Sequence, residues 1–139
     1  MTKKFLRATI CAMILLAGVD AAGQQKKSAT PLPLVESAKS FVVMLTKENY
    51  AGAAKNFDKQ LKSEMPPAKL REVWQALTKH VGPFKRQLGV SAGKARDGDS
   101  SYDVVIIKCE FERAPINARL VFDKNKQITG MFFIPAKTQ

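Results

Sequence analysis

The spacing of apolar residues changes at Gly82-Pro83, and this change constrains the fold more than any other feature of the chain. Before it, apolar residues recur every three or four positions, which is the period of a helix with one buried face. After it, they recur every second position, which is the period of a half-buried strand. A helical half followed by a strand half predicts an α+β domain, with helices packed on one face of an antiparallel sheet.

Three helices are predicted in the first half. Pro33 suits a first helical position, and this helix runs to about Lys47. A second helix, capped by Asn49, has a buried face that carries Tyr50, Ala53, Ala54, Phe57 and Leu61. A third begins after Pro66-Pro67, and its buried stripe carries Leu70, Val73, Trp74, Leu77 and Val81. Gly82 is placed to end this helix, because Pro83 prevents its continuation.

Four strands, joined as a meander, are predicted in the second half. The first begins at Phe84, and alternation places Leu88, Val90 and Ala92 on one of its faces. The next two strands have apolar faces made of Val105, Ile107, Cys109 and Phe111, and of Ile116, Ala118, Leu120 and Phe122. The last strand runs from Ile128 to Ile134, with a bulge expected at Gly130. A curved sheet covered by helices encloses a cone, which either fills with side chains or holds a small ligand.

The first 21 residues have the pattern of an export signal. Three basic residues precede the apolar run Ala8–Gly18, which is too short to span a bilayer comfortably, and small residues lead up to Ala21. The alternative is an uncleaved membrane anchor. Val19 stands where a lipoprotein signal needs cysteine, so no lipid anchor is expected. The expected organisation is a signal peptide at 1–21, a linker at 22–33, one α+β domain at 34–135 and a tail at 136–139.

The chain is strongly basic, with a net charge of +11. Removal of the leader takes away three basic residues and one acidic residue, which leaves +9 on the mature chain. This charge favours adsorption to anionic envelope polymers. Nucleic acid is not expected as a partner, because the basic residues are scattered through every segment and no aromatic-rich RNA-binding signature is present. Cys11 lies in the leader, so Cys109 is left alone and no internal disulfide is expected.

No convincing catalytic set is visible in the sequence. Residues 89–93 match G-x-S-x-G, but this motif lies within a predicted strand, and no histidine follows Ser91 to accept its proton. His80 is the only histidine, and its place in the last turn of a helix suits a structural or solvated cation. No spacing typical of a metal site is found, and no cofactor is expected. Cys109 is expected to be a small buried hydrophobe rather than a reactive thiol.

Four residues are candidates for ligand binding, and each has an alternative role. Trp74 belongs either to the core or to a stacking platform at the cone. Arg86 shares strand parity with Phe84, so it is either an inward charge that meets an anionic ligand or a sheet-edge residue with its head in water. Tyr102 and Arg119 contribute polar contacts only if their faces line a pocket.

Three segments carry a resemblance to a known family. The run Asn49–Asp58, the block from Leu70 to Phe84 with Trp74, and the ending Val121–Pro135 resemble the bacterial domain-of-unknown-function 3887 family. The likeness extends from about Leu34 to Pro135 and rests on hydrophobic and turn positions. It implies an α+β cone similar to nuclear-transport-factor-2-like or cystatin-like domains. Members stand alone behind a signal peptide or precede a secreted α/β-hydrolase domain, and the resemblance supplies no catalytic residues.

These observations favour an exported, non-catalytic domain that binds a small anionic ligand or an envelope partner. An accessory or docking domain for a separately encoded secreted α/β-hydrolase is the alternative, since the chain ends at Gln139 and a fused hydrolase is not expected. An enzyme that uses the cone as its site is the third hypothesis, and it needs acid–base groups pointing inward. A homodimer through the sheet also stays open, and membrane contact is expected only through an uncleaved signal.

Overall fold

The computed structural model describes residues 31–137, and the expected signal peptide and most of the expected linker lie outside this range. Four helices come first in the chain: α1 (Leu32–Thr46), α2 (Tyr50–Ala54), α3 (Lys59–Glu64) and α4 (Pro67–Val81). Four strands follow: β1 (Phe84–Asp97), β2 (Ser100–Phe111), β3 (Pro115–Phe122) and β4 (Ile128–Pro135). The α+β prediction is confirmed.

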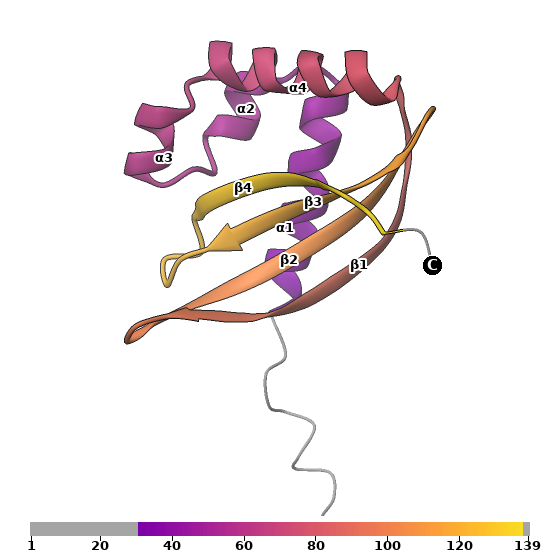
Figure 1. The fold of residues 1–139 in the computed structure, drawn as a ribbon. Coiled ribbons are helices and arrows are strands. Elements are labelled where there is room, and N and C mark those ends of the chain that lie inside the picture. The colour runs from indigo at the N-terminus through magenta and orange to yellow at the C-terminus, as the bar shows by residue number, and fades with distance from the viewer. Residues whose placement is uncertain (1–30, 138–139) are drawn as a thin grey trace, which may run out of the picture.

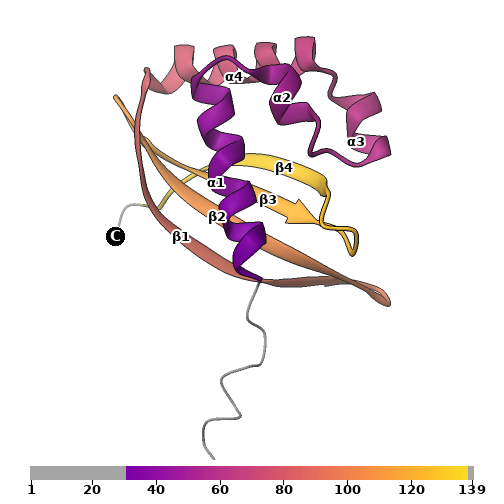
Figure 2. The ribbon, with the colours of Figure 1, turned by 180° about the vertical axis from the view of Figure 1, so that it is seen from behind.

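The strands form one antiparallel sheet in the order β1-β2-β3-β4, as expected for a meander. All described helices lie on the same side of this sheet, and α4 crosses above its end (Figures 1 and 2). In β3 every second residue is buried, so one face of the sheet is covered by helices. The opposite face carries none of the described helices, and we refer to the two as the helix-covered face and the open face.

The predicted second helix is divided in two, which corrects the expected count of three helices to four. Asn49 caps α2 as predicted, because its side-chain oxygen accepts a hydrogen bond from Gly52 N at 3.0 Å. Asp58 caps α3 in the same way, accepting from Leu61 N at 2.7 Å. Between the two helices the backbone bonds to β4 instead: Asp58 N donates to Ile128 O, and Ile128 N donates to Asn56 O. These bonds to the sheet replace the helical bonds.

The end of α4 is held by the loop between β2 and β3. Gly82 takes a positive φ of 86°, and its N–H donates to Thr78 O at 2.8 Å. The Arg113 guanidinium donates to the carbonyls of Lys79 and His80, at 3.1 and 3.2 Å. A cation at this position satisfies carbonyls that have no partner within the helix and opposes the negative end of its dipole.

Strand β1 differs from the regular alternation expected for it. Register shifts interrupt its pairing with β2 between Phe84 and Arg86 and again between Gln87 and Gly89. Each shift changes which face the following residues occupy. The second shift reverses the first, so Val90 pairs with buried Ile107 and lies on the helix-covered face, as alternation predicts. Leu88 is the extra residue at the second shift, and Leu88 and Val90 are nevertheless 45% and 38% exposed.

Strand β4 contains one irregularity, close to the expected bulge. Val121 pairs with Gly130 and Phe122 pairs with Ile128, so Thr129 is the extra residue. The bulge thus lies one residue before the predicted position.

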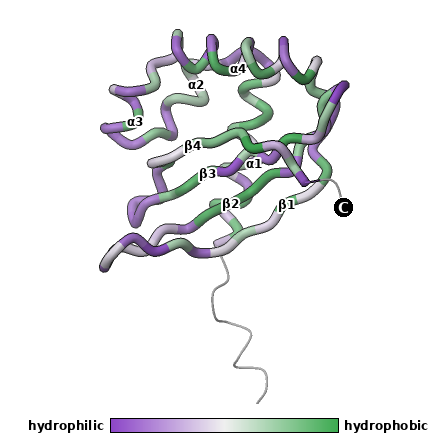
Figure 3. The backbone as a smooth tube through the Cα atoms, viewed as in Figure 1, coloured by the Kyte–Doolittle hydropathy of each residue, from purple (hydrophilic) through white to green (hydrophobic). Residues whose placement is uncertain are grey.

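The space between helices and sheet is filled with apolar side chains. The largest of the fully buried side chains are those of Phe41, Phe57, Phe122, Leu45, Leu70, Ile107, Leu120 and Ile128. Figure 3 shows hydrophobic stretches along α1, β2 and β4, whereas the tip of the β1–β2 hairpin is hydrophilic. Of the two outcomes foreseen for the cone, the structure shows the filled one.

Candidate functional site

A cluster of aromatic rings fills the helix-covered face where α4 crosses the sheet. Trp74 is 6% exposed, in agreement with its predicted place on the buried stripe. Its ring lies 5.7 Å from that of Phe111, 5.9 Å from Phe133 and 6.4 Å from Phe84, centroid to centroid. These tilted contacts are typical of packed aromatic cores. Trp74 therefore acts mainly as a core residue.

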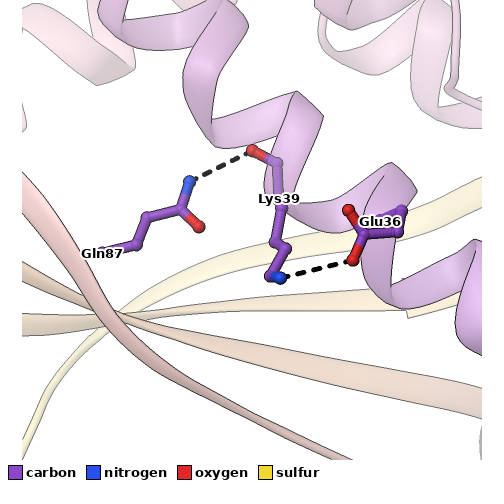
Figure 4. Close-up of polar contacts among 3 residues, drawn as sticks. All are labelled: Glu36, Lys39 and Gln87. Carbon is purple, nitrogen blue, oxygen red and sulfur yellow. Dashed lines mark hydrogen bonds and ion pairs between the residues drawn. The ribbon is translucent and has the colours of Figure 1, made fainter.

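A surface cleft lies between α1 and the start of β1. Its volume is about 740 Å³, and it is lined by Glu36, Lys39, Ser40, Val43, Met44, Lys47, Asn49, Phe84 and Gln87. Gln87 donates from Nε2 to the backbone oxygen of Lys39 at 3.1 Å, which ties the edge strand to the helix (Figure 4). Lys39 Nζ pairs with Glu36 Oε1 at 3.3 Å. Gln87, Lys39 and Glu36 therefore use these polar groups in contacts with one another.

A second hollow of about 410 Å³ adjoins this cleft and shares Lys47 and Phe84 with it. Its other lining residues are Thr46, Glu48, Trp74, Thr78 and Pro83. Lys47 has no ion pair among residues 31–137. The cleft can therefore offer the unpaired ammonium group of Lys47 and an apolar wall to a ligand, while its other lysine, Lys39, is already paired with Glu36.

The open face of the sheet combines apolar and basic side chains. It carries Val104, Ile106 and Lys108 from β2, Asn117, Arg119 and Val121 from β3, Phe132 and Ile134 from β4, and Gly89, Ser91 and Ala95 from β1. Phe132 is 49% exposed and Ile134 is 43% exposed. The guanidinium carbon of Arg119 lies 5.8 Å from the centroid of the Phe132 ring, which is a cation–π distance.

Two shallow hollows flank Ile106 on the open face, with volumes of about 240 and 380 Å³. Ser91 lines both, and Gly89 lines the larger one. The hollows exist because β1 contributes only small residues to this part of the face, while β2 and β3 contribute large ones. The small residues of the G-x-S-x-G pattern therefore form the floor or wall of these hollows.

The four predicted ligand-binding residues lie in separate places. Trp74 is in the core, and Arg119 is on the open face. Arg86 pairs with Glu110 on the neighbouring strand, with 2.6 Å between Nε and Oε2, and its side chain is 70% exposed. Of the two alternatives for Arg86, the structure shows the residue with its head in water and not the inward charge. Tyr102 lines a hollow of about 410 Å³ between the two hairpin ends, together with Asp99 and Asp123.

Ser91 and His80 do not form a catalytic pair. Ser91 lies in the middle of β1, opposite Ile106, so it lacks the strand-to-helix turn that exposes a nucleophilic serine. His80 lies in the last turn of α4, which is a different layer of the fold. Within residues 31–137 there is no cluster of three or more histidine, cysteine or acidic residues able to hold a metal ion.

Two buried groups have raised pKa values, and neither suits catalysis at neutral pH. Burial raises the pKa of the Cys109 thiol to about 11, and its Sγ lies 3.6 Å from Ile107 O. The thiol is therefore protonated at neutral pH and poorly nucleophilic, as expected for a buried hydrophobe. Burial, and then the charge of Glu48, raise the pKa of Tyr50, while Arg71 acts in the opposite direction.

The Tyr50 hydroxyl is buried and has no hydrogen-bond partner among the described residues. Sequence reasoning placed this side chain on a buried face but gave no sign that its hydroxyl would lack a partner. Tyr50 lines none of the hollows described above. The Gln87 and Arg113 contacts to helix carbonyls were missed as well, because each joins residues more than 30 positions apart.

None of the helices between residues 31 and 137 is both long enough and apolar enough to cross a bilayer. A solved NMR structure of a protein from Ruminococcus gnavus has the same fold, with a TM-score of 0.62 and 16% identity, over 76% of this chain and 92% of that one. Esterase EstD from Thermotoga maritima is 26% identical over 93 residues. That match covers 67% of this chain but only 22% of the esterase, so the chain spans about a fifth of that relative.

A family model described as "Protein of unknown function (DUF3887)" matches residues 38–131. The match runs from the first turns of α1 into β4, and it includes Trp74, Phe84 and Phe111 but ends before Phe132, Phe133 and Ile134. Because it covers more than half of the 139 residues, the chain belongs to the DUF3887 family.

Proposed function

We propose that this protein is an exported, non-catalytic module that acts by binding a partner on its surface. The observation that carries the proposal is the filled interior. Phe111 and Phe122 are buried together with Trp74 in the space where a cone-shaped enzyme or carrier would hold its ligand. Burial of these side chains contributes stability, and the space that they fill is not available to a substrate. Support for binding therefore comes from the outer surfaces.

A hydrolase-associated role is the second candidate, because the domain shares sequence with part of an esterase. EstD is an esterase by name, and the segment similar to this chain makes up 22% of it. An accessory domain of this kind would work beside a separately encoded enzyme by docking to it. The two candidates agree that the chain itself does no chemistry, and they differ in the partner.

The absence of hydrolysis is directly testable. The purified mature chain is expected to hydrolyse p-nitrophenyl acetate and p-nitrophenyl butyrate no faster than buffer, because no histidine accompanies Ser91 on the open face. Ser91→Ala is the matched variant and should give the same rate. Turnover by the parent chain that disappears in a folded Ser91→Ala variant would contradict the non-catalytic proposal.

Export is a separate part of the proposal, supported by the basic start, the apolar run and the small residues before Ala21. Protein recovered from the periplasm or medium is expected to begin between Ala22 and Gln24, which intact mass measurement decides. Replacing the apolar run Ala8–Gly18 with polar residues should retain the full-length chain inside the cell. Recovery of the parent chain from membranes with Met1 still attached would show an anchor instead of a cleaved signal.

A further inference from the structure

We propose that the open face of the sheet is a docking surface for a protein partner whose contact surface combines carboxylates with apolar side chains. This inference rests on the proposed binding function and adds the surface and the chemistry of the partner. It also gives a role to the small residues of β1 that the G-x-S-x-G pattern contains.

The open face is apolar along β4, its edge strand, where two large side chains are exposed. Phe132 and Ile134 alternate in β4 with Met131 and Phe133, which pack against the core on the other side. Half-exposed Phe132 and Ile134 therefore sit on a strand that is already anchored. Large aromatic and aliphatic side chains beside an arginine are the composition typical of the centre of a protein interface.

The charges of the open face favour a partner whose contact surface is negatively charged. Arg86 and Glu110 neutralise each other at one edge. Arg119 and Lys108 have no carboxylate partner among residues 31–137, and Arg119 faces the Phe132 ring instead. A second copy of this chain would bring two more unpaired cations to the same surface, which is unfavourable. An acidic partner supplies the missing carboxylates.

The shape of the open face favours a broad partner. The eight residues of β3 and of β4 extend about 26 Å, β1 and β2 are longer with 14 and 12 residues, and four strands span about 19 Å, which gives a face of at least roughly 500 Å² in projection. Specific interfaces take about 800 Å² of accessible surface from each partner, so a partner has to cover the whole face. The two hollows beside Ile106, about 240 and 380 Å³, can receive side chains that project from it.

The test is photocrosslinking of the full-length chain in the organism that encodes it. The probe is p-benzoylphenylalanine in place of Ile134, with the exposed helix residue Gln75 on α4 as the control position. Irradiation is expected to give one protein adduct from position 134 and none from position 75. Mass spectrometry of the adduct is expected to locate the crosslink in an acidic surface of another protein.

Affinity measurements with the purified partner complete the test. Phe132→Ser and Arg119→Gln are each expected to weaken binding roughly tenfold or more, because central aromatic and arginine residues dominate interfaces. Added salt should weaken binding of the parent chain more than that of Arg119→Gln. Lys79→Gln removes a charge from α4 and should change affinity less than about twofold. Unchanged melting temperatures of the variants establish that folding is intact.

The alternative outcomes separate the two levels of the proposal. An adduct only at position 75 would overturn docking on the open face while leaving a binding module. An adduct between two copies of this chain, or with a partner that lacks carboxylates at the contact, would overturn the acidic partner. If Lys79→Gln and Arg119→Gln weaken binding equally, the partner is held by the overall positive charge of the chain and not by the open face. A lack of adducts at both positions would count against the open face and the proposed function together.

Discussion

Replacing Trp74 with alanine is expected to lower the free energy of unfolding by roughly 3–5 kcal/mol, which is the usual cost of removing a buried tryptophan. The indole contacts the rings of Phe84, Phe111 and Phe133, which come from the first, second and last strands. Its removal opens a cavity that these rings cannot fill without losing their contacts to the sheet. The lost stability therefore has two contributions: the free energy of transferring the indole from water to the core, and the cost of the cavity that remains.

Urea unfolding followed by far-UV circular dichroism measures this loss, since the variant lacks the tryptophan needed for fluorescence. Gln75→Ala is the matched control, because Gln75 is the next residue of α4 and is exposed. It should change stability by less than about 0.5 kcal/mol. A cost below about 1 kcal/mol for Trp74→Ala would mean that the indole packs loosely and is free to act as a ligand platform.

Gly82→Ala is expected to cost roughly 3 kcal/mol, for two reasons that act together. With φ of 86° and ψ of 176°, Gly82 occupies a region that essentially only glycine adopts. A Cβ at this position would also lie 2.6 Å from the Cβ of Glu112. The backbone cannot move away easily, because Gly82 N, Arg113 N and Glu112 N all donate hydrogen bonds at this corner.

The control for this glycine is Gly89→Ala. A methyl group at Gly89 would meet nothing within 4 Å, and no positive φ is required there. This variant should unfold within about 0.5 kcal/mol of the parent chain, since surface changes away from special features have small effects. If Gly82→Ala and Gly89→Ala are equally stable in urea melts, the backbone between α4 and β1 moves to accept the added methyl group, and the prediction is wrong.

The parts of the fold set by local pattern were predictable from the sequence. Helix α4 has regular apolar spacing between a proline start and a Gly-Pro end, and the structure places it at Pro67–Val81. The division of the second helix was not predictable, because it depends on Phe57 bridging to Ile128 in the last strand. The face that Arg86 occupies was not predictable, because the irregularity between Phe84 and Arg86 changes parity and leaves no mark in the sequence.

The candidate site was less predictable than the fold. All four residues from Met131 to Ile134 are apolar, so alternation cannot tell which of them face the core. The structure turns Phe132 and Ile134 outward and places Phe132 beside Arg119 of the neighbouring strand. Arg119 was a candidate from sequence, but its aromatic neighbour lies in another strand. Cross-strand register supplies this information, and register depends on the bulge near Gly130.

The order of elements along the chain has a consequence for synthesis. Between residues 31 and 137 every helix precedes every strand, and α2 and α3 are only five and six residues long. Isolated helices this short are not stable in water, so the first half of the chain has nothing to fold against while it leaves the ribosome. The segment at Asn56–Asp58 bonds to Ile128, so it waits for the last strand. The native packing of the first half of the domain is therefore completed only after β4 has been made.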